Sequence, residues 1–183
     1  MILEIVKFGN PVLRAKGKPV AEINPAISEL AANMIDTMRA ANGVGLAAQQ
    51  VVKAVQLTVL DVLDMEDRPS TMTMDGKPCN LKDWMPMVLL NPQLELGKER
   101  EPGSEGCLSF PEITADIQRS AAVHATGQLL DGSRIEFEAT GLLARALQHE
   151  VDHLNGILFI DRMNSATKTG LSGRLKRLQR ENS

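Results

Sequence analysis

Apolar side chains recur at helical spacing in two segments of the chain. The first begins at Asn24-Pro25, an N-cap followed by a proline at the first helical position, and ends at Asn42-Gly43. The second runs from Thr140, a candidate N-cap, to Gly156, a candidate C-terminal glycine. Its apolar positions are Leu142, Leu143, Ala146, Leu147, Val151 and Leu154. Both segments are predicted to be amphipathic helices.

Short apolar runs with strand character lie between these helices. They cover residues 56–61, 87–91, 121–127 and 134–138, and Asp131-Gly132 is the predicted hairpin turn between the last two. The strands do not alternate regularly with helices, which favours an α+β fold over a doubly wound fold. We therefore predict antiparallel or mixed β-sheets packed around the second helix as a central element.

Composition and length favour a single domain over residues 1–183. No linker rich in Pro, Gly or Ser divides the chain, and no apolar run approaches the roughly 18 residues of a membrane span. The first seven residues lack the basic lead and apolar block of a signal peptide, so a cytoplasmic protein is expected. Twenty basic and 23 acidic residues give a net charge of −3, which predicts no nucleic-acid recognition by the molecule as a whole.

The C-terminal tail, near residues 166–183, differs in charge from the rest of the chain. Its basic residues are Lys168, Arg174, Lys176, Arg177 and Arg180, against the single acidic residue Glu181. A solvated terminal helix or a frayed end is expected, and a docking surface for an anionic partner is the alternative.

The second predicted helix carries two histidines and a glutamate whose spacing is typical of a metal site. At about 100° per residue, His149 and His153 lie roughly 40° apart, so both imidazoles can face one metal ion. Glu150 lies about 60 to 100° from them, where it can reach a water on the metal but cannot easily be a ligand. The pattern predicts a hydrolytic metal site with a base beside it, against the alternative of two core histidines and a solvated Glu.

A catalytic metal of this kind usually has a third protein ligand. The extended metzincin pattern requires a histidine six residues after His153, and Phe159 occupies that position. The only other histidine, His124, alternates with Val123 along a predicted strand and is expected to face solvent.

The two cysteines have different surroundings. Cys107 lies in Glu105-Gly106-Cys107-Leu108-Ser109, where the glycine permits close backbone approach, and its thiolate would complete a Cys-His-His site. Cys79 lies in a polar, Met-rich stretch and is expected to be an incidental thiol, with no disulfide needed in a chain of this size.

Three segments together resemble the signature motifs of the peptide deformylase family, in the same order. They are Gly43-Val44-Gly45-Leu46-Ala47-Ala48-Gln49-Gln50, Glu105-Gly106-Cys107-Leu108-Ser109 and Gln148-His149-Glu150-Val151-Asp152-His153. The similarity includes residues 8–14 and 90–92 and spans most of residues 1–165. The resemblance implies a deformylase-like fold and removal of the formyl group from the N-terminal formyl-methionine of nascent polypeptides, with release of formate.

The resemblance also implies roles for individual residues. Metal held by Cys107, His149 and His153 would lower the pKa of its water and supply the hydroxide that attacks the formyl carbon. Glu150 would take the water proton and pass it to the leaving amine. The oxyanion donors of the family map onto the side-chain amide of Gln50 and the backbone N–H of Leu108.

The substrate pocket is expected to use five residues. Gly45 would let the peptide approach and pair with backbone, and Val44, Leu142 and Ala146 are candidate walls for the methionine side chain. Arg145, where some family members carry an apolar residue, is expected to line the pocket with its stem while its guanidinium reaches solvent or a substrate carbonyl.

One divalent metal per chain is expected. One thiolate and two imidazoles suit Fe²⁺, Zn²⁺, Ni²⁺ or Co²⁺, and the resemblance implies Fe²⁺. The implied partners are formyl-methionyl nascent peptides and, through the basic tail at 166–183, the ribosome from which those peptides emerge.

Residues 62–86 form an insert where many deformylases have a much shorter connection. It contains Met65, Met72, Met74, Met85 and the only tryptophan, Trp84. We expect a surface excursion packed by its own side chains, with a lid over the peptide site or an oligomer contact as alternatives.

Two other functions remain open from the sequence. A metallopeptidase or another small-amide hydrolase could use the same Cys-His-His site, and an inactive relative could act as a binding module. The second is disfavoured because Glu150 and all three ligands are present.

Overall fold

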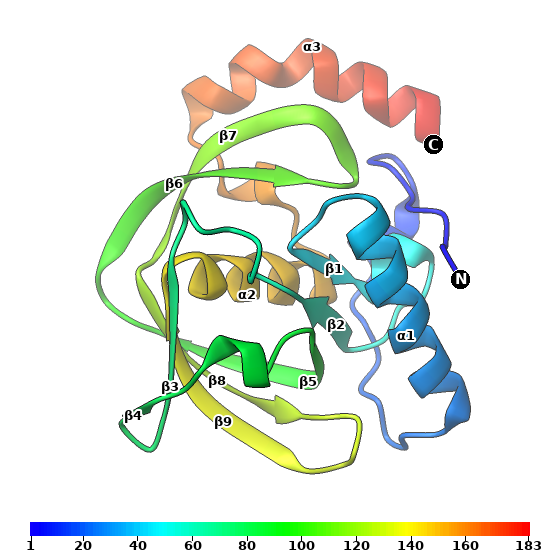
Figure 1. The fold of residues 1–183 in the computed structure, drawn as a ribbon. Coiled ribbons are helices and arrows are strands. Elements are labelled where there is room, and N and C mark those ends of the chain that lie inside the picture. The colour runs from blue at the N-terminus through cyan, green and yellow to red at the C-terminus, as the bar shows by residue number, and fades with distance from the viewer.

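The structure, a computed structural model, describes residues 1–183 and contains three α-helices and nine β-strands (Figure 1). The helices are α1 (Pro25–Ala40), α2 (Gly141–Leu154) and α3 (Ser165–Asn182). The strands are β1 (Gly45–Ala47), β2 (Leu57–Leu60), β3 (Ser70–Met74), β4 (Lys77–Pro78), β5 (Met87–Leu96), β6 (Arg100–Cys107), β7 (Phe110–Ser120), β8 (Ala122–Gln128) and β9 (Arg134–Thr140).

The strands form two antiparallel sheets. Seven of them make one sheet in the order β1-β2-β5-β8-β9-β3-β4, and β6 and β7 make a separate two-stranded sheet. Helix α2 runs through the centre of the molecule and contacts strands of both sheets (Figure 1). The predicted α+β arrangement around this helix is confirmed.

The ends of the two predicted helices are set by specific hydrogen bonds. The Asn24 side chain accepts from the N–H of Ile27 at 3.0 Å and caps α1. At the C-terminus of α2, Gly156 has φ of 75° and the N–H of Ile157 donates to the Asp152 carbonyl at 2.9 Å, a Schellman closure.

Thr140 stands at the predicted N-cap position of α2 but does not cap the helix with its side chain. Its hydroxyl contacts the hydroxyl of Thr71 in β3 and makes no capping bond. Instead, Ser70 Oγ accepts from the N–H of Leu143 at 2.9 Å. The cap therefore comes from a neighbouring strand, a tertiary contact that a local sequence pattern does not reveal.

Helix α2 buries its apolar residues against the larger sheet. Leu142, Leu143, Ala146 and Leu147 belong to the same core cluster as Leu89 of β5 and Phe137 of β9. A second cluster packs α1 on β1 and β2. The first cluster thus packs the predicted metal-bearing helix on the larger sheet, and this packing helps to fix the positions of His149 and His153.

The insert at 62–86 is part of the main sheet. Strand β3 pairs with β9, and Met72 and Met85 are buried in the same core cluster as α2. The expectation of an excursion packed by its own side chains is therefore wrong. The pairing of β3 with β9 places Met72 opposite Ala139, in the same core cluster.

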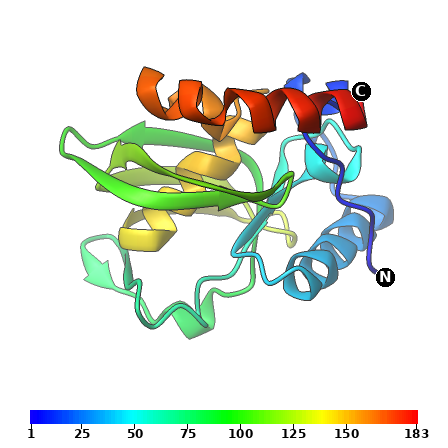
Figure 2. The ribbon, with the colours of Figure 1, turned by 90° about the horizontal axis from the view of Figure 1, so that it is seen from above.

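Helix α3 lies across the β6-β7 sheet, as Figures 1 and 2 show. Leu171, Leu175 and Leu178 pack against a cluster that includes Phe110 and Ile117 of β7. Leu175 is the only buried residue of the helix, so most of its basic side chains face solvent. None of the helices combines the length and the apolar character that a membrane span would need.

Candidate active site

Cys107, His149 and His153 come together at one point. Their ligand atoms all lie within 4.8 Å of one another, and Cys107 Sγ is 3.3 Å from His153 Nε2. The two histidines occupy one face of α2, four residues apart, as the helical spacing predicted. Cys107 ends β6, where the register with β7 shifts after Gly106, and this irregularity turns its side chain towards the helix.

The donor set fits a divalent transition metal. One thiolate and two imidazoles in mutual reach are the ligands of catalytic sites that keep one position open for water. His149 uses Nδ1 for a 2.9 Å hydrogen bond with Glu105, which leaves Nε2 as the nitrogen that can face the ion. His153 and Cys107 meet through Nε2 and Sγ, the atoms that would bind.

Glu105 is the functional residue that the sequence analysis missed. Its buried carboxylate accepts hydrogen bonds from His149, from Arg119 through two nitrogens at 2.9 and 3.0 Å, and from Arg145 at 2.8 Å. Arg119 also donates to Asp152 at 2.6 Å. A chain of charges therefore fixes the orientation of one metal ligand. In the sequence, the only indication of a role for Glu105 is its position two residues before Cys107.

The pKa of Glu105 reflects these partners. Burial alone would raise its pKa, but the hydrogen bonds from His149 and Arg119 outweigh burial and lower the pKa to about 2. Glu105 is therefore a carboxylate at neutral pH, and it can hold the Nδ1–H of His149 in place.

Glu150 has the opposite environment. Its residue is 5% exposed and its Oε2 has no hydrogen-bond partner in the protein. Burial raises the pKa of Glu150 to about 7, against an opposing effect of the nearby His149. A carboxyl group with a pKa near neutrality can both accept and return a proton.

Gly45 makes room for the Glu150 side chain. A Cβ at position 45 would lie 2.6 Å from Glu150 Oε1 and 2.9 Å from its Cγ. The expected reason for this glycine was approach of a substrate peptide, whereas the structure shows that the Glu150 carboxylate itself occupies the space.

Gln50 and Leu108 present donors beside the thiolate. Gln50 Oε1 accepts from the Ala47 N–H at 3.0 Å, and its Nε2 lies 3.7 Å from Cys107 Sγ and 3.1 Å from Ser109 Oγ. The Leu108 N–H makes no hydrogen bond within the protein, while its carbonyl accepts from Lys7 Nζ at 3.1 Å. Both N–H groups are therefore placed next to the metal ligands.

A pocket with a volume of about 460 Å³ opens on this site. Its lining includes Cys107, His149 and Glu150. All five predicted substrate-binding residues lie in its walls, namely Val44, Gly45, Leu142, Arg145 and Ala146.

The Arg145 guanidinium does not reach solvent, contrary to expectation. It donates to Glu105, to the Ile117 carbonyl at 2.8 Å and to the Glu101 carbonyl at 2.9 Å. A buried carboxylate and the carbonyls of the small sheet attract it more strongly than open solvent. Only the rest of the side chain is left to line the pocket.

The insert also contributes to this pocket. Met65 and Arg68 line it together with the metal ligands, and the Arg68 guanidinium makes no ion pair. The insert thus reaches the site with two side chains while its strands belong to the sheet.

The remaining histidine and cysteine lie outside the metal group. His124 of β8 is 2.8 Å from Glu136 on β9, through Nε2 and Oε1. Cys79 is a free thiol in the insert, and Cys107 is also free of any disulfide. The choice of Cys107 over His124 as the third ligand candidate agrees with the geometry.

Comparison with known proteins gives a consistent result. The polypeptide deformylase family model matches residues 2–169. The peptide deformylase of Methylacidiphilum infernorum is 41% identical over 180 residues, 98% of this chain and 94% of that protein. The peptide deformylase of Opitutus terrae is 43% identical over 180 residues, 97% of this chain and 93% of that protein.

Solved structures show the same likeness. The crystal structure of the Thermotoga maritima peptide deformylase has a TM-score of 0.75 at 38% identity and covers 90% of this chain and 99% of its own. Arabidopsis thaliana peptide deformylase 1B, solved with an inhibitor, has a TM-score of 0.83 at 33% identity, over 98% of this chain and 91% of its own. With a Cys-His-His group, a buried glutamate and a shared fold, the chain belongs to the peptide deformylase family.

Proposed function

We propose that this chain removes the N-formyl group from the initiator formyl-methionine of nascent polypeptides by hydrolysis, releasing formate and a free amine. The observation that supports this most is the position of Glu150, buried and unpartnered at Oε2, beside the group formed by Cys107, His149 and His153. Residues 1–183 are proposed to act as one catalytic domain.

We assign the metal to Cys107, His149 and His153 and propose Fe²⁺ as the ion. When bound, a divalent cation with these ligands acidifies a water molecule and polarises the formyl oxygen. Glu105 holds His149 in the orientation that this requires, through the 2.9 Å contact with Nδ1.

Glu150 acts as the proton carrier. A single carboxyl group with a pKa of about 7 can take a proton from the attacking water and then give it to the amine nitrogen as the C–N bond breaks. The carboxyl group is buried and lines the active-site pocket, so it faces the place where the two reacting groups meet.

Gln50 and Leu108 stabilise the charge on the formyl oxygen. One N–H donor is the side-chain amide of Gln50, which lies 3.7 Å from Cys107 Sγ, and the other is the backbone N–H of Leu108, the residue after Cys107. Both are held in place before substrate binds, because Gln50 is anchored through Oε1 to Ala47 and the Leu108 carbonyl is anchored to Lys7. Such preorganised donors are worth several kcal/mol in the transition state, about 3 for one donor.

Substrate binds along strand β1. This strand ends the sheet order, so one of its edges is free to pair with an extended peptide. Val44, Leu142, Ala146 and the stem of Arg145 then form the walls for the methionine side chain.

The proposal is tested by comparing three peptides that differ only at the N-terminus. Formyl-Met-Ala-Ser, acetyl-Met-Ala-Ser and free Met-Ala-Ser are incubated with metal-loaded protein, and formate and new amines are measured. Formate release from the first peptide only supports the proposal. Cleavage of the free peptide between residues would instead indicate a metallopeptidase.

Two finer assignments have their own tests. Protein prepared without oxygen should carry iron and be more active than air-exposed protein, because a ferrous thiolate site is oxidised in air; equal activity with bound zinc would contradict Fe²⁺. We also propose a cytoplasmic setting and a ribosome contact through α3, and expect co-sedimentation with ribosomes that is weaker in Lys176→Glu/Arg177→Glu. Retained co-sedimentation would contradict a role for α3.

A further inference from the structure

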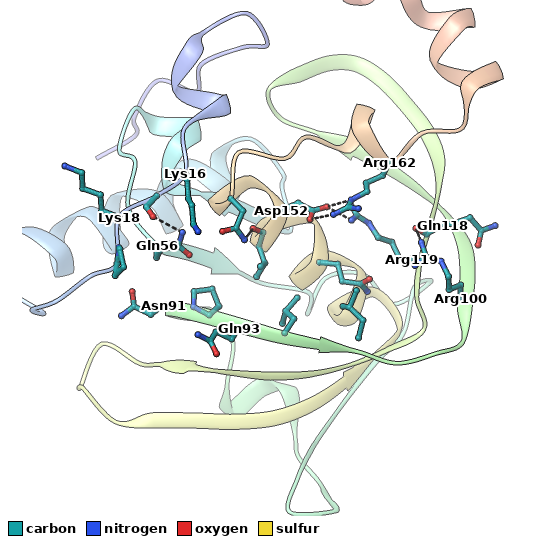
Figure 3. Close-up of a pocket in the computed structure, with 18 residues that line it drawn as sticks. Lys16, Lys18, Gln56, Asn91, Gln93, Arg100, Gln118, Arg119, Asp152 and Arg162 are labelled. Atoms are coloured by element: carbon teal, nitrogen blue, oxygen red, sulfur yellow. Dashed lines mark hydrogen bonds and ion pairs between the residues drawn. The ribbon is translucent and has the colours of Figure 1, made fainter.

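A second, larger concavity lies on a different face from the active site. It has a volume of about 970 Å³ and shares no lining residue with the active-site pocket. Figure 3 shows it along β5, with Lys16 and Lys18 towards one end, Arg100 towards the other, and Asp152 of α2 between them. We call this concavity the β5 groove.

The β5 groove is strongly basic although the chain has a net charge of −3. Five of its lining residues are cationic and only Asp152 is acidic. Both Arg119 and Arg162 bind that carboxylate, at 2.6 Å and 2.9 Å, so it has little capacity to repel an anion. The net charge of the molecule is therefore negative although this groove is positive.

Three cations of the groove have no acidic partner. Lys16, Lys18 and Arg100 are exposed and take part in no ion pair. Arg100 donates only to the backbone carbonyl of Gln118 at 2.9 Å. Since these residues stand at opposite ends of the groove (Figure 3), one small anion cannot contact all of them.

The uncharged lining identifies the class of ligand. Half of the other lining residues carry side-chain amides, and the amides of Gln93 and Gln118 have no protein partner. No aromatic ring lines the groove, so it lacks both the anchors of a typical protein interface and a platform for base stacking. Surfaces that are concave, polar and positive are characteristic of nucleic-acid contacts.

We propose that the β5 groove binds the phosphodiester backbone of a single-stranded RNA without reading its sequence. Lys16 and Lys18 contact phosphates at one end and Arg100 at the other. The free amides of Gln93 and Gln118 bind ribose hydroxyl groups between them. A single strand can extend between the two basic ends, because they stand apart along β5 (Figure 3).

The test uses the full chain and a fluorescent oligouridine of about twelve nucleotides. Binding is followed by anisotropy at about 50 and 200 mM salt. Three phosphate contacts on a single strand predict a slope of log affinity against log salt of about −2, and hence roughly 20-fold weaker binding at the higher salt. Absence of binding at the lower salt overturns the proposal.

Charge reversal at each basic surface locates the site. Lys16→Glu/Lys18→Glu should weaken binding about tenfold or more and reduce the salt slope, because two of the three contacts are lost. Lys176→Glu/Arg177→Glu on α3 is the matched control and should bind like the unaltered chain. The proposal fails if only the α3 variant loses binding, or if neither variant does.

Two further ligands separate RNA from other polyanions. A deoxyribose strand of the same length should bind more weakly, since it lacks the hydroxyl groups that the amides contact. A poly-glutamate peptide of similar charge should bind more weakly still. Equal binding of either ligand overturns the assignment to RNA. Both charge-reversal variants should keep their formyl-peptide hydrolysis, which shows that they are folded.

Discussion

Glu105 Oε1 lies 2.9 Å from Nδ1 of His149, and the same carboxylate is bound by Arg119 and Arg145. Arg119 in turn binds Asp152, which also binds Arg162. A metal ligand at the centre of the molecule is thus held by a line of alternating charges that reaches the surface. The line joins β6, β7 and α2, so the fold and the orientation of the ligand depend on one carboxylate.

Replacing Glu105 by Gln should therefore affect both stability and metal binding. The buried Arg145 would lose its only counter-charge, and Arg119 would keep Asp152 alone, which together cost about 3 to 5 kcal/mol. Metal affinity should fall about 10- to 100-fold because His149 is no longer held. Denaturant unfolding and metal titration measure the two effects. Glu101→Gln, whose side chain is exposed, is the control, and equal behaviour of the two variants would contradict the role of Glu105.

Gly45→Ala should reduce turnover while leaving the metal in place. The new Cβ would lie 2.6 Å from Glu150 Oε1 and must displace that carboxylate. A displacement near 1 Å at a reacting group can cost about 100-fold in rate. Gly106→Ala is the control from the same pocket, because its Cβ would meet nothing closer than 3.5 Å. Equal rates of formate release in the two variants would show that catalysis does not depend on the space that Gly45 leaves for the Glu150 carboxylate.

The two cysteines offer a matched test of the third ligand. Cys107→Ser should lose most of the bound metal, because a neutral hydroxyl replaces the thiolate that completes the site. Cys79→Ser should keep a full complement, since Cys79 lies outside the metal group. Elemental analysis of the purified variants measures this directly. Full metal content in Cys107→Ser would exclude Cys107 as a ligand.

Asp161 should contribute to stability at neutral pH but not in acid. Burial alone would raise its pKa, but hydrogen bonds from Arg14 and the Leu158 N–H outweigh burial and hold the pKa below 3.8. A depressed folded pKa stabilises above the unfolded value of about 4, and this stabilisation is lost as pH falls through the folded pKa. The Tm difference between the unaltered chain and Asp161→Asn should therefore shrink below about pH 4. A difference that stays constant down to pH 2 would contradict this coupling.

Much of the site could be predicted because several of its residues are close together in the sequence, at a spacing that one helix brings onto one face. His149, Glu150 and His153 lie on one helical turn, and the helix was evident from its apolar positions and from Gly156. Strands with clear apolar character, such as β2 and β8, were also found at nearly their observed positions.

The strands and contacts that the sequence did not predict have no apolar pattern or capping residue of their own. Strand β6 has only one buried residue, the charged Glu105, so it shows no apolar alternation. Strand β5 continues to Leu96, past the predicted end at residue 91, through a register shift between Leu90 and Gln93. Pro92 lies within this shift and has no N–H to donate to a neighbouring strand. The partners of Arg145 and the cap from Ser70 arise from tertiary contacts, which no single segment encodes.

The most direct test of the account is formate release by Glu150→Gln, measured together with bound metal. The amide keeps the shape of the side chain but cannot accept the proton of water. We predict a full metal complement, like that of the unaltered chain, and turnover of a formyl-Met peptide reduced about 100- to 10,000-fold. Turnover near that of the unaltered chain, with metal bound, would contradict the assignment of Glu150 as the proton carrier of a deformylase.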